Sequence, residues 1–207
     1  MPKQDKKLGK PDVVRKYRSL TPLFKDMSVC TRCELALTRT HVVPGVGNRN
    51  AEIMLLGEAP GKNEDLAATP FVGRGGQLLD EILTKAGISR DDVFITNTAA
   101  CRPPKNRTPR TSEVRAHAPW LEQQIQLVDP VVVVTLGRVA LTYFLPKAKV
   151  TELRGKPQKV QYGDHELTVF PTLHPAAALR DPKLKPAIAS DFRKLAAWLN
   201  KSKRRKG

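Results

Sequence analysis

The stretch Ile53-Met54-Leu55-Leu56-Gly57-Glu58-Ala59-Pro60-Gly61 decides the fold of this chain, because an uninterrupted apolar run passes directly into a loop of glycine, proline and a carboxylate. An apolar run without polar alternation is typical of a strand that is covered on both faces of a parallel sheet. Further runs of this kind occupy residues 93–96, 131–136 and 168–170. Helical patterns alternate with them, so the sequence predicts an α/β fold around a short, central, mainly parallel sheet of four strands.

Polar side chains with useful chemistry come directly after these runs. Glu58 follows the first run, Asn97 follows the second and His174 follows the fourth. Ligands of an open parallel sheet bind outside the carboxyl ends of its strands. The sequence therefore predicts an active site in which a carboxylate, an amide and an imidazole meet at one edge of the sheet.

The chain of 207 residues is strongly basic, with 36 Lys and Arg against 20 Asp and Glu and a formal net charge of +16. We expect a flexible basic arm at 1–14, a single domain at 15–200 and a basic tail at 201–207. Because the body is basic as well as the ends, we expect a polyanionic partner, with nucleic acid favoured over an anionic membrane. The sequence has no apolar stretch near the ~20 residues that span a bilayer and no apolar core of a signal peptide, so we expect a cytoplasmic protein, and we expect a monomer.

The three cysteines predict a metal site. Cys30 and Cys33 form a Cys-x2-Cys pair, a spacing that lets two thiolates of one turn hold a metal ion or a cluster. An odd number of cysteines in a reducing compartment makes disulfides a poor explanation. Cys101 follows the second predicted strand, and His117 beyond it is the nearest candidate for a fourth ligand.

The motifs together resemble family 4 uracil-DNA glycosylases, the iron–sulfur branch of the uracil-DNA glycosylase superfamily. The resemblance extends from about residue 30 to residue 199 and depends on the order and spacing of five motifs. These are Gly57-Glu58-Ala59-Pro60-Gly61 with Glu64-Asp65, Pro70-Phe71-Val72-Gly73, Thr96-Asn97, Cys101-Arg102-Pro103-Pro104 with Asn106-Arg107-Thr108-Pro109, and His174-Pro175. The resemblance implies a three-layer α/β/α domain. It also implies an enzyme that flips uracil out of single- or double-stranded DNA and hydrolyses its N-glycosidic bond, leaving an abasic site.

The resemblance also suggests roles for individual residues. Asn97 would read the edge of uracil, His174 would stabilise the charge on the departing base, and Glu58 would either orient water or hydrogen-bond the pocket. Phe71 would stack on the base, unless it is an ordinary core residue, and Leu179 would be a wedge in the minor groove, unless it packs within its own helix. The other expected contacts to the base or its pocket are Ala59, Glu64 and Asn106, and the other expected contacts to DNA are Arg102, Arg107, Pro175 and Arg180.

The sequence departs from the family at His117, where typical members have a fourth cysteine. The resemblance implies a 4Fe–4S cluster held by Cys30, Cys33, Cys101 and His117, and two alternatives stay open: a lost or labile cluster, and zinc. Two alternative functions also stay open. One is a glycosylase that prefers another damaged base, and the other is a non-catalytic DNA-binding module stapled by a metal.

Overall fold

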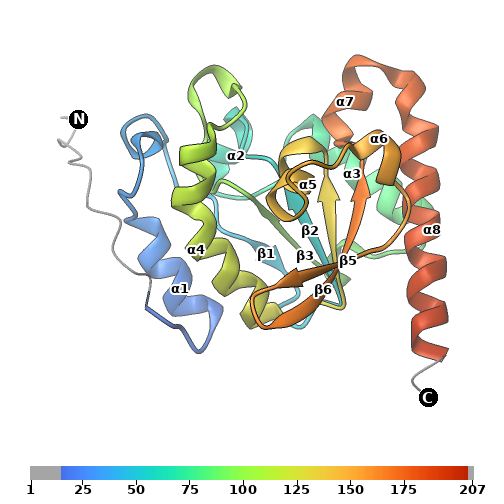
Figure 1. Cartoon of the computed structure of the whole chain (residues 1–207). Coiled ribbons are helices and arrows are strands. Elements are labelled where there is room, and N and C mark those ends of the chain that lie inside the picture. The colour runs from blue at the N-terminus through green and yellow to red at the C-terminus, as the bar shows by residue number, and fades with distance from the viewer. Residues whose placement is uncertain (1–14, 205–207) are drawn as a thin grey trace.

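The computed structural model describes residues 15–204, which form a mixed α/β fold around one six-stranded sheet (Figure 1). The strand order is β1-β3-β2-β4-β6-β5, and the four inner strands run parallel while both edge strands are antiparallel. The inner strands are β3 (Val93–Asn97), β2 (Ile53–Gly57), β4 (Val132–Leu136) and β6 (His165–Thr172), and the edge strands are β1 (Val46–Gly47) and β5 (Gln158–Tyr162). The basic arm expected at 1–14 lies outside the described residues.

The expected number of four strands is wrong, because it omits the two edge strands. β1 has only two residues, both exposed, and β5 mixes exposed and half-buried positions around a single buried valine. An edge strand of this kind has no continuous apolar run, which was the signal that identified the four inner strands. The inner strands are buried along their length except at the start of β6.

Helices cover both faces of the sheet, so the fold has three layers (Figure 1). Successive strand residues point to opposite faces: Met54 and Phe94 join the core beneath one set of helices, while Leu55 and Ile95 join the core beneath the other set. The first set is α1 (Leu20–Ser28), α4 (Thr111–Val128), α5 (Arg138–Phe144) and α6 (Val150–Leu153), and the second is α3 (Arg74–Lys85), α7 (Pro175–Arg180) and α8 (Lys185–Arg204). The remaining helical segments are α2 (Lys62–Ala67) and 3-10 turns at Glu34–Leu37, Arg90–Asp92, Pro104–Asn106 and Pro182–Leu184.

Helix α4 runs through Pro119 without the interruption that the sequence suggests for an internal proline. A proline removes one backbone donor, but the apolar side of α4 is anchored in the core by Trp120, Leu121 and Ile125. The last helix, α8, continues to Arg204, past the expected domain boundary at residue 200 and into the predicted tail, of which residues 205–207 lie outside the described residues. None of the helices formed by residues 15–204 is both long and apolar enough to cross a bilayer.

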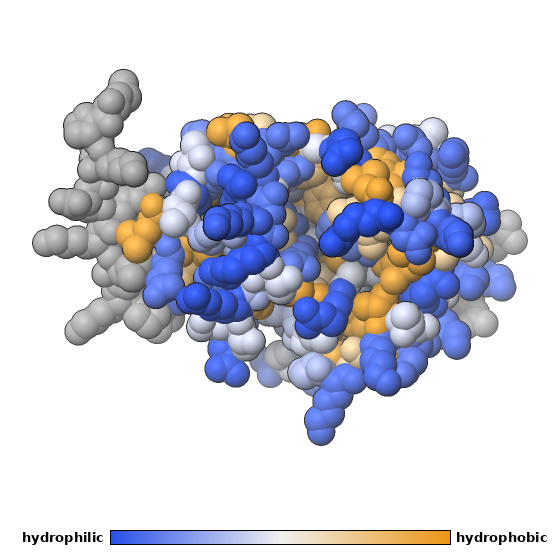
Figure 2. Space-filling view, turned by 90° about the horizontal axis from the view of Figure 1, so that it is seen from above, coloured by the Kyte–Doolittle hydropathy of each residue, from blue (hydrophilic) through white to orange (hydrophobic). Residues whose placement is uncertain are grey.

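The register of the strands brings distant loops together at one edge of the sheet. Gly57 and Asn97 are paired at the ends of β2 and β3. The Gly137 N–H donates to the Thr172 carbonyl at 2.9 Å, which joins the ends of β4 and β6. Figure 2 shows the molecule from this side, where hydrophilic side chains surround a hollowed surface with apolar groups between them.

Candidate active site

A cavity of about 320 Å³ opens at the carboxyl edge of the sheet. Its walls come from the loops that follow β2, β3 and β6, and from the first turn of α3. The walls include many of the residues that the sequence singles out: Ala59, Glu64, Phe71, Asn97, Asn106, His174 and Leu179. The predicted convergence of an amide and an imidazole at this edge is therefore seen in the structure.

Glu58 lies beside this cavity and does not line it. It lines a second cavity of about 220 Å³, together with Pro60, Arg107 and Arg180. The two cavities share four wall residues, which are Ala59, Asn106, His174 and Ala176. The carboxylate expected beside the amide therefore lines an adjoining cavity and not the one that Asn97 lines.

The amide of Asn97 and the ring of Phe71 pack on the backbone of Gly57. A methyl group placed on Gly57 would lie 2.3 Å from Asn97 Oδ1 and 2.8 Å from the Phe71 ring. Phe71 has a φ of +56°, a left-handed conformation that is rare for an aromatic residue and is typical of functional sites. Gly76 permits this backbone, since a methyl group there would collide with the Phe71 carbonyl.

The hydrogen bonds of His174 define its tautomer. The Ala176 N–H donates to Nδ1 at 3.1 Å, so Nδ1 is an acceptor and the proton of the neutral ring is on Nε2. Burial, reinforced by the charge of Arg180, lowers the pKa of His174 to about 4. The ring is therefore neutral near pH 7 and presents Nε2 as its N–H donor. It also lies nearly parallel to Phe71, with 5.8 Å between ring centroids and 23° between planes.

A buried polar network anchors the end of β6, two residues before His174. The Thr172 hydroxyl donates to Asp191 Oδ2 at 2.7 Å, and Arg154 pairs with the same carboxylate at 3.0 Å. Thr172 and Asp191 are fully buried. Burial raises the pKa of Asp191, while the Thr172 hydroxyl and the charge of Arg154 act in the opposite direction. The network fixes the strand end to α8 and limits where the imidazole can lie.

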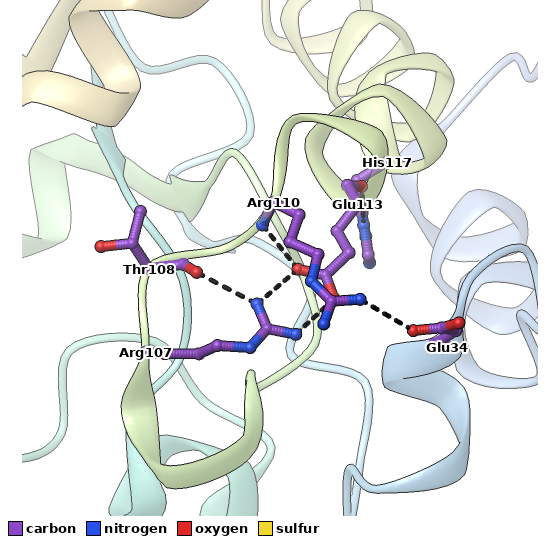
Figure 3. Close-up of polar contacts among 6 residues, drawn as sticks. All are labelled: Glu34, Arg107, Thr108, Arg110, Glu113 and His117. Carbon is purple, nitrogen blue, oxygen red and sulfur yellow. Dashed lines mark hydrogen bonds and ion pairs between the residues drawn. The ribbon is translucent and has the colours of Figure 1, made fainter.

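The loop before α4 is held by an ion pair that Figure 3 shows. Arg107 contacts both oxygens of Glu113, at 2.8 and 2.6 Å, and the Arg110 N–H donates to the same carboxylate at 2.6 Å. The hydrogen bond from Arg107 lowers the pKa of Glu113. Asn106 is left-handed at a φ of +55° and accepts from Arg102 Nε at 2.6 Å. The ion pair therefore presents Asn106 to both cavities on a fixed loop.

One face of α4 carries a buried polar stripe, formed by Glu113, His117, Trp120 and Gln124. Gln124 Oε1 accepts from the Gly45 N–H at 3.1 Å and from the Thr96 hydroxyl at 3.0 Å. The stripe thus extends from the loop that carries Asn106 to the strand that ends at Asn97.

Each of the three cysteines accepts one N–H donor. Trp120 Nε1 donates to Cys30 Sγ at 3.3 Å, Arg39 Nη1 donates to Cys101 Sγ at 3.4 Å, and the Leu35 backbone hydrogen-bonds Cys33. Hydrogen bonds of this kind are typical of sulfurs that ligate a metal or a cluster. Burial raises the pKa of Cys101 to about 12, against the opposing charge of Arg39. Such a thiol is protonated near pH 7, and a metal that binds its thiolate releases the proton to solvent.

His117, the fourth ligand expected from the sequence, is also buried. Figure 3 shows His117 beside Glu113, and its Nδ1 donates to the Glu113 carbonyl at 2.8 Å. Nε2 is buried and has no hydrogen-bond partner among residues 15–204. A ligating histidine typically donates one ring N–H to a carbonyl and binds through the other nitrogen. Burial lowers the pKa of His117 to about 4, so that its lone pair is free of a proton.

Cys30, Cys33, Cys101 and His117 have the chemistry of cluster ligands, three sulfurs and one imidazole nitrogen. Within the described part of the chain, no three His, Cys, Asp or Glu side chains converge closely enough to hold one metal ion, so the cluster is an expectation from the resemblance.

The family is shown by comparison with known proteins. The family model for the uracil DNA glycosylase superfamily matches residues 44–199. The chain belongs to the uracil-DNA glycosylase superfamily. It is 44% identical over 183 residues to the Type-4 uracil-DNA glycosylase of Sulfurisphaera tokodaii, covering 86% of this chain and 83% of that protein. It is 42% identical to the Type-4 uracil-DNA glycosylase of Thermotoga maritima, with coverage of 83% and 90%. The Type-5 uracil-DNA glycosylase of Thermus thermophilus is 39% identical over a shorter region that covers 50% of this chain.

Around the pocket of this superfamily member, the residues expected to contact DNA lie in two groups. Leu179 lines the first cavity, Arg107 and Arg180 line the second, and Pro175 begins α7, the helix that carries Leu179 and Arg180. Arg102 lines neither cavity and instead contacts Asn106. Leu179 lies within α7 and is partly exposed, so its helix does not bury it.

Several site residues were not identified from the sequence. Lys62 and Asn63 line the first cavity from the start of α2. Their position directly after the Gly57–Gly61 motif could have indicated that they lie at the same edge of the sheet. The roles of Arg39, Thr172 and Asp191 depend on contacts between distant segments, which no local pattern indicates.

Proposed function

We propose that this protein is a DNA repair glycosylase that hydrolyses the N-glycosidic bond of uracil in DNA and leaves an abasic site. The observation that carries the proposal is the cavity at the sheet edge, where an amide, an aromatic ring and a neutral imidazole line one space. Membership of the superfamily and the similarity to proteins named Type-4 uracil-DNA glycosylase support it.

Asn97 and Phe71 are proposed to select the base. A side-chain amide donates to uracil O4 and accepts from N3–H, whereas cytosine presents the opposite pattern at these two positions. Asn97 is almost completely buried, so an unsuitable base edge leaves polar groups without partners in a dry site. The Phe71 ring provides an apolar surface on which the flipped base stacks.

His174 is proposed to stabilise the departing base. Cleavage of the bond between C1′ and N1 leaves a negative charge on uracil, chiefly at O2. A neutral imidazole with its proton on Nε2 donates to that oxygen, and the bond strengthens as charge develops. Removal of one such donor typically lowers turnover by about 10²- to 10³-fold.

Glu58 is proposed to orient the attacking water from the second cavity, which shares His174 with the cavity that would hold the base. The water oxygen forms a bond to C1′ as the bond to N1 breaks, and the water proton passes to solvent or to the carboxylate. Glu64 is proposed to shape the base pocket indirectly, because its Oε1 accepts from the Gly73 N–H at 2.8 Å and so ties α2 to the start of α3.

The DNA strand is proposed to cross the two cavities. Leu179 on α7 would enter the space left by the flipped base, with Arg180 beside it facing phosphate. Arg107 is proposed to fix the loop that presents Asn106 and Arg102 to the strand, since its guanidinium is already paired with Glu113.

A 4Fe–4S cluster is proposed at Cys30, Cys33, Cys101 and His117. The unpartnered Nε2 of His117 and the N–H donors to the three sulfurs support this donor set. The cluster would supply structure and no step of the hydrolysis, because it would join the segment before the sheet to α4 and to the loop after β3. Iron and sulfide analysis after anaerobic purification separates this proposal from zinc and from a labile cluster.

The function is tested by release of free uracil from oligonucleotides that carry dU, single- or double-stranded, in the presence of EDTA. We expect release and an abasic product, with an Asn97→Asp variant slower by about tenfold to hundredfold, since a lost buried hydrogen bond costs roughly 1–3 kcal/mol. Release of hypoxanthine or mismatched thymine in preference to uracil would instead indicate the alternative specificity. Binding of dU-containing DNA without release of any base would indicate a non-catalytic module.

A further inference from the structure

Arg39 is a buried cation that lies among the proposed ligands of the metal site. Its Nη1 donates to Cys101 Sγ at 3.4 Å and its Nη2 donates to the Cys30 carbonyl. One guanidinium therefore contacts the two segments that carry Cys30 and Cys101, which lie far apart in the sequence.

Arg39 forms no ion pair with any carboxylate of residues 15–204. Its side chain is only 8% exposed, so water cannot compensate for the charge. Two acidic residues near the proposed ligands have other partners: Glu113 is engaged by Arg107 and by the Arg110 backbone, and Glu34 pairs with the Arg110 side chain. A buried cation without a carboxylate is costly unless another anion is present. The cysteine thiolates of a loaded metal site are such anions.

We propose that Arg39 is the counter-ion of the metal site, and that together with the neutral ligand His117 it makes a loaded 4Fe–4S site formally neutral. This inference depends on the cluster put forward under the proposed function. An oxidised 4Fe–4S core carries two positive charges, three thiolates bring three negative charges, and Arg39 restores one positive charge. Neutral His117 adds none, whereas a fourth thiolate would leave the site with one net negative charge.

The charge balance predicts the direction in which the reduction potential changes. Reduction adds an electron, so a nearby positive charge and N–H···S hydrogen bonds favour the reduced cluster. Removal of the Arg39 charge should lower the potential. Replacement of His117 by cysteine adds a negative charge and should lower it as well. A lysine at position 39 keeps the charge and should retain most of the effect.

The test compares wild type with Arg39→Gln, Arg39→Lys and His117→Cys after anaerobic reconstitution with iron and sulfide. Arg49→Gln is the matched control, because Arg49 is an exposed cation that hydrogen-bonds Thr21 at 3.1 Å. Iron per chain, the visible spectrum and the midpoint potential in a redox titration are measured for each protein. We expect lower potentials for Arg39→Gln and His117→Cys, and a potential near that of wild type for Arg39→Lys and Arg49→Gln.

An Arg39→Gln protein with full iron and an unchanged potential would overturn the proposal. If Arg39→Gln cannot hold iron, retention of iron by Arg39→Lys supports the role of the charge, and loss of iron by both variants refutes it. Uracil release is measured on the same preparations. A wild-type protein that releases uracil but holds no iron, or holds zinc, refutes the counter-ion while the proposed enzymatic function stands. The expected potentials without uracil release would support the counter-ion and refute the enzyme.

Discussion

The side chain of Asn97 lies directly on the backbone of Gly57, since a methyl group on that glycine would come within 2.3 Å of Asn97 Oδ1. The contact follows from the register of the sheet, which pairs these two residues at the ends of β2 and β3. The absence of a side chain at position 57 therefore sets where the amide lies.

Gly57→Ala should displace Asn97 and the Phe71 ring together. We expect uracil release to fall by about tenfold to hundredfold, the loss that corresponds to one misplaced buried hydrogen bond. The kinetics of Gly57→Ala are compared with those of Gly87→Ala, whose methyl group meets no atom within 4 Å. Gly87→Ala should lose some stability, because its φ is +72°, but keep its activity. An equally active Gly57→Ala would show that the amide is not held by this contact.

Thr172→Val should lower the turnover number more than it weakens the binding of dU-containing DNA. The substitution removes the hydroxyl that anchors the end of β6 to Asp191, two residues before His174, and it leaves Asp191 Oδ2 with one donor fewer. Thr135→Val is the matched control, because Thr135 is a fully buried threonine on the neighbouring strand whose hydroxyl has no partner among the described residues. Equal kinetics for the two variants would assign Thr172 to stability alone.

The stability of the folded protein should fall as the pH is lowered from about 6.5 to about 4. Over this range an unfolded histidine takes up a proton, at a pKa near 6.5, whereas folded His174 stays neutral down to a pKa of about 4. The unfolded state then binds more protons, so its free energy falls relative to that of the native state. Urea unfolding of wild type and His174→Gln at several pH values measures this contribution. The variant should show a shallower dependence, and identical curves would mean that His174 keeps an ordinary pKa.

Leu179→Ala should slow uracil release from double-stranded DNA and leave release from single-stranded DNA almost unchanged. A wedge is needed only where a flipped base leaves a gap in a stack. Val131→Ala is the matched control. Val131 directly precedes β4, is exposed to the same extent, 39%, and lines neither cavity. A similar loss on both substrates would indicate that Leu179 shapes the base pocket and does not act as a wedge.

The sequence revealed the parts of the fold that are buried on both sides. The runs in β2, β3 and β4 are continuous and apolar because helices cover both faces of the sheet, so the unbroken runs alone identified them. The edge strand β5 was missed because solvent covers part of it and its apolar pattern is broken. Asn97 and His174 could be identified as pocket residues because parallel strands carry their loops to one edge.

The sequence did not reveal the contacts that fix these side chains. Arg39 meets Cys101 across 62 positions of the chain, and Thr172 meets Asp191 on a separate helix. Such contacts depend on how helices pack against the sheet. Because arginine, threonine and aspartate are mostly exposed in proteins, the sequence alone does not predict that these three are buried. Glu58 was correctly placed in the loop after β2, but which of two adjoining cavities it faces depends on details of that loop.

The buried polar stripe of α4 restricts how the length of this protein can change. A helix turns by about 100° for each residue, so one inserted or deleted residue between Glu113 and Gln124 would rotate part of the stripe off its partners. Four side chains would then no longer lie on one side of the helix. These are Glu113, which pairs with Arg107, His117 with its unpartnered Nε2, Trp120, which donates to Cys30 Sγ, and Gln124, which accepts from Thr96. Variation in length among descendants of this chain should therefore collect in the loops that flank α4, while the segment between these residues keeps a constant number of residues.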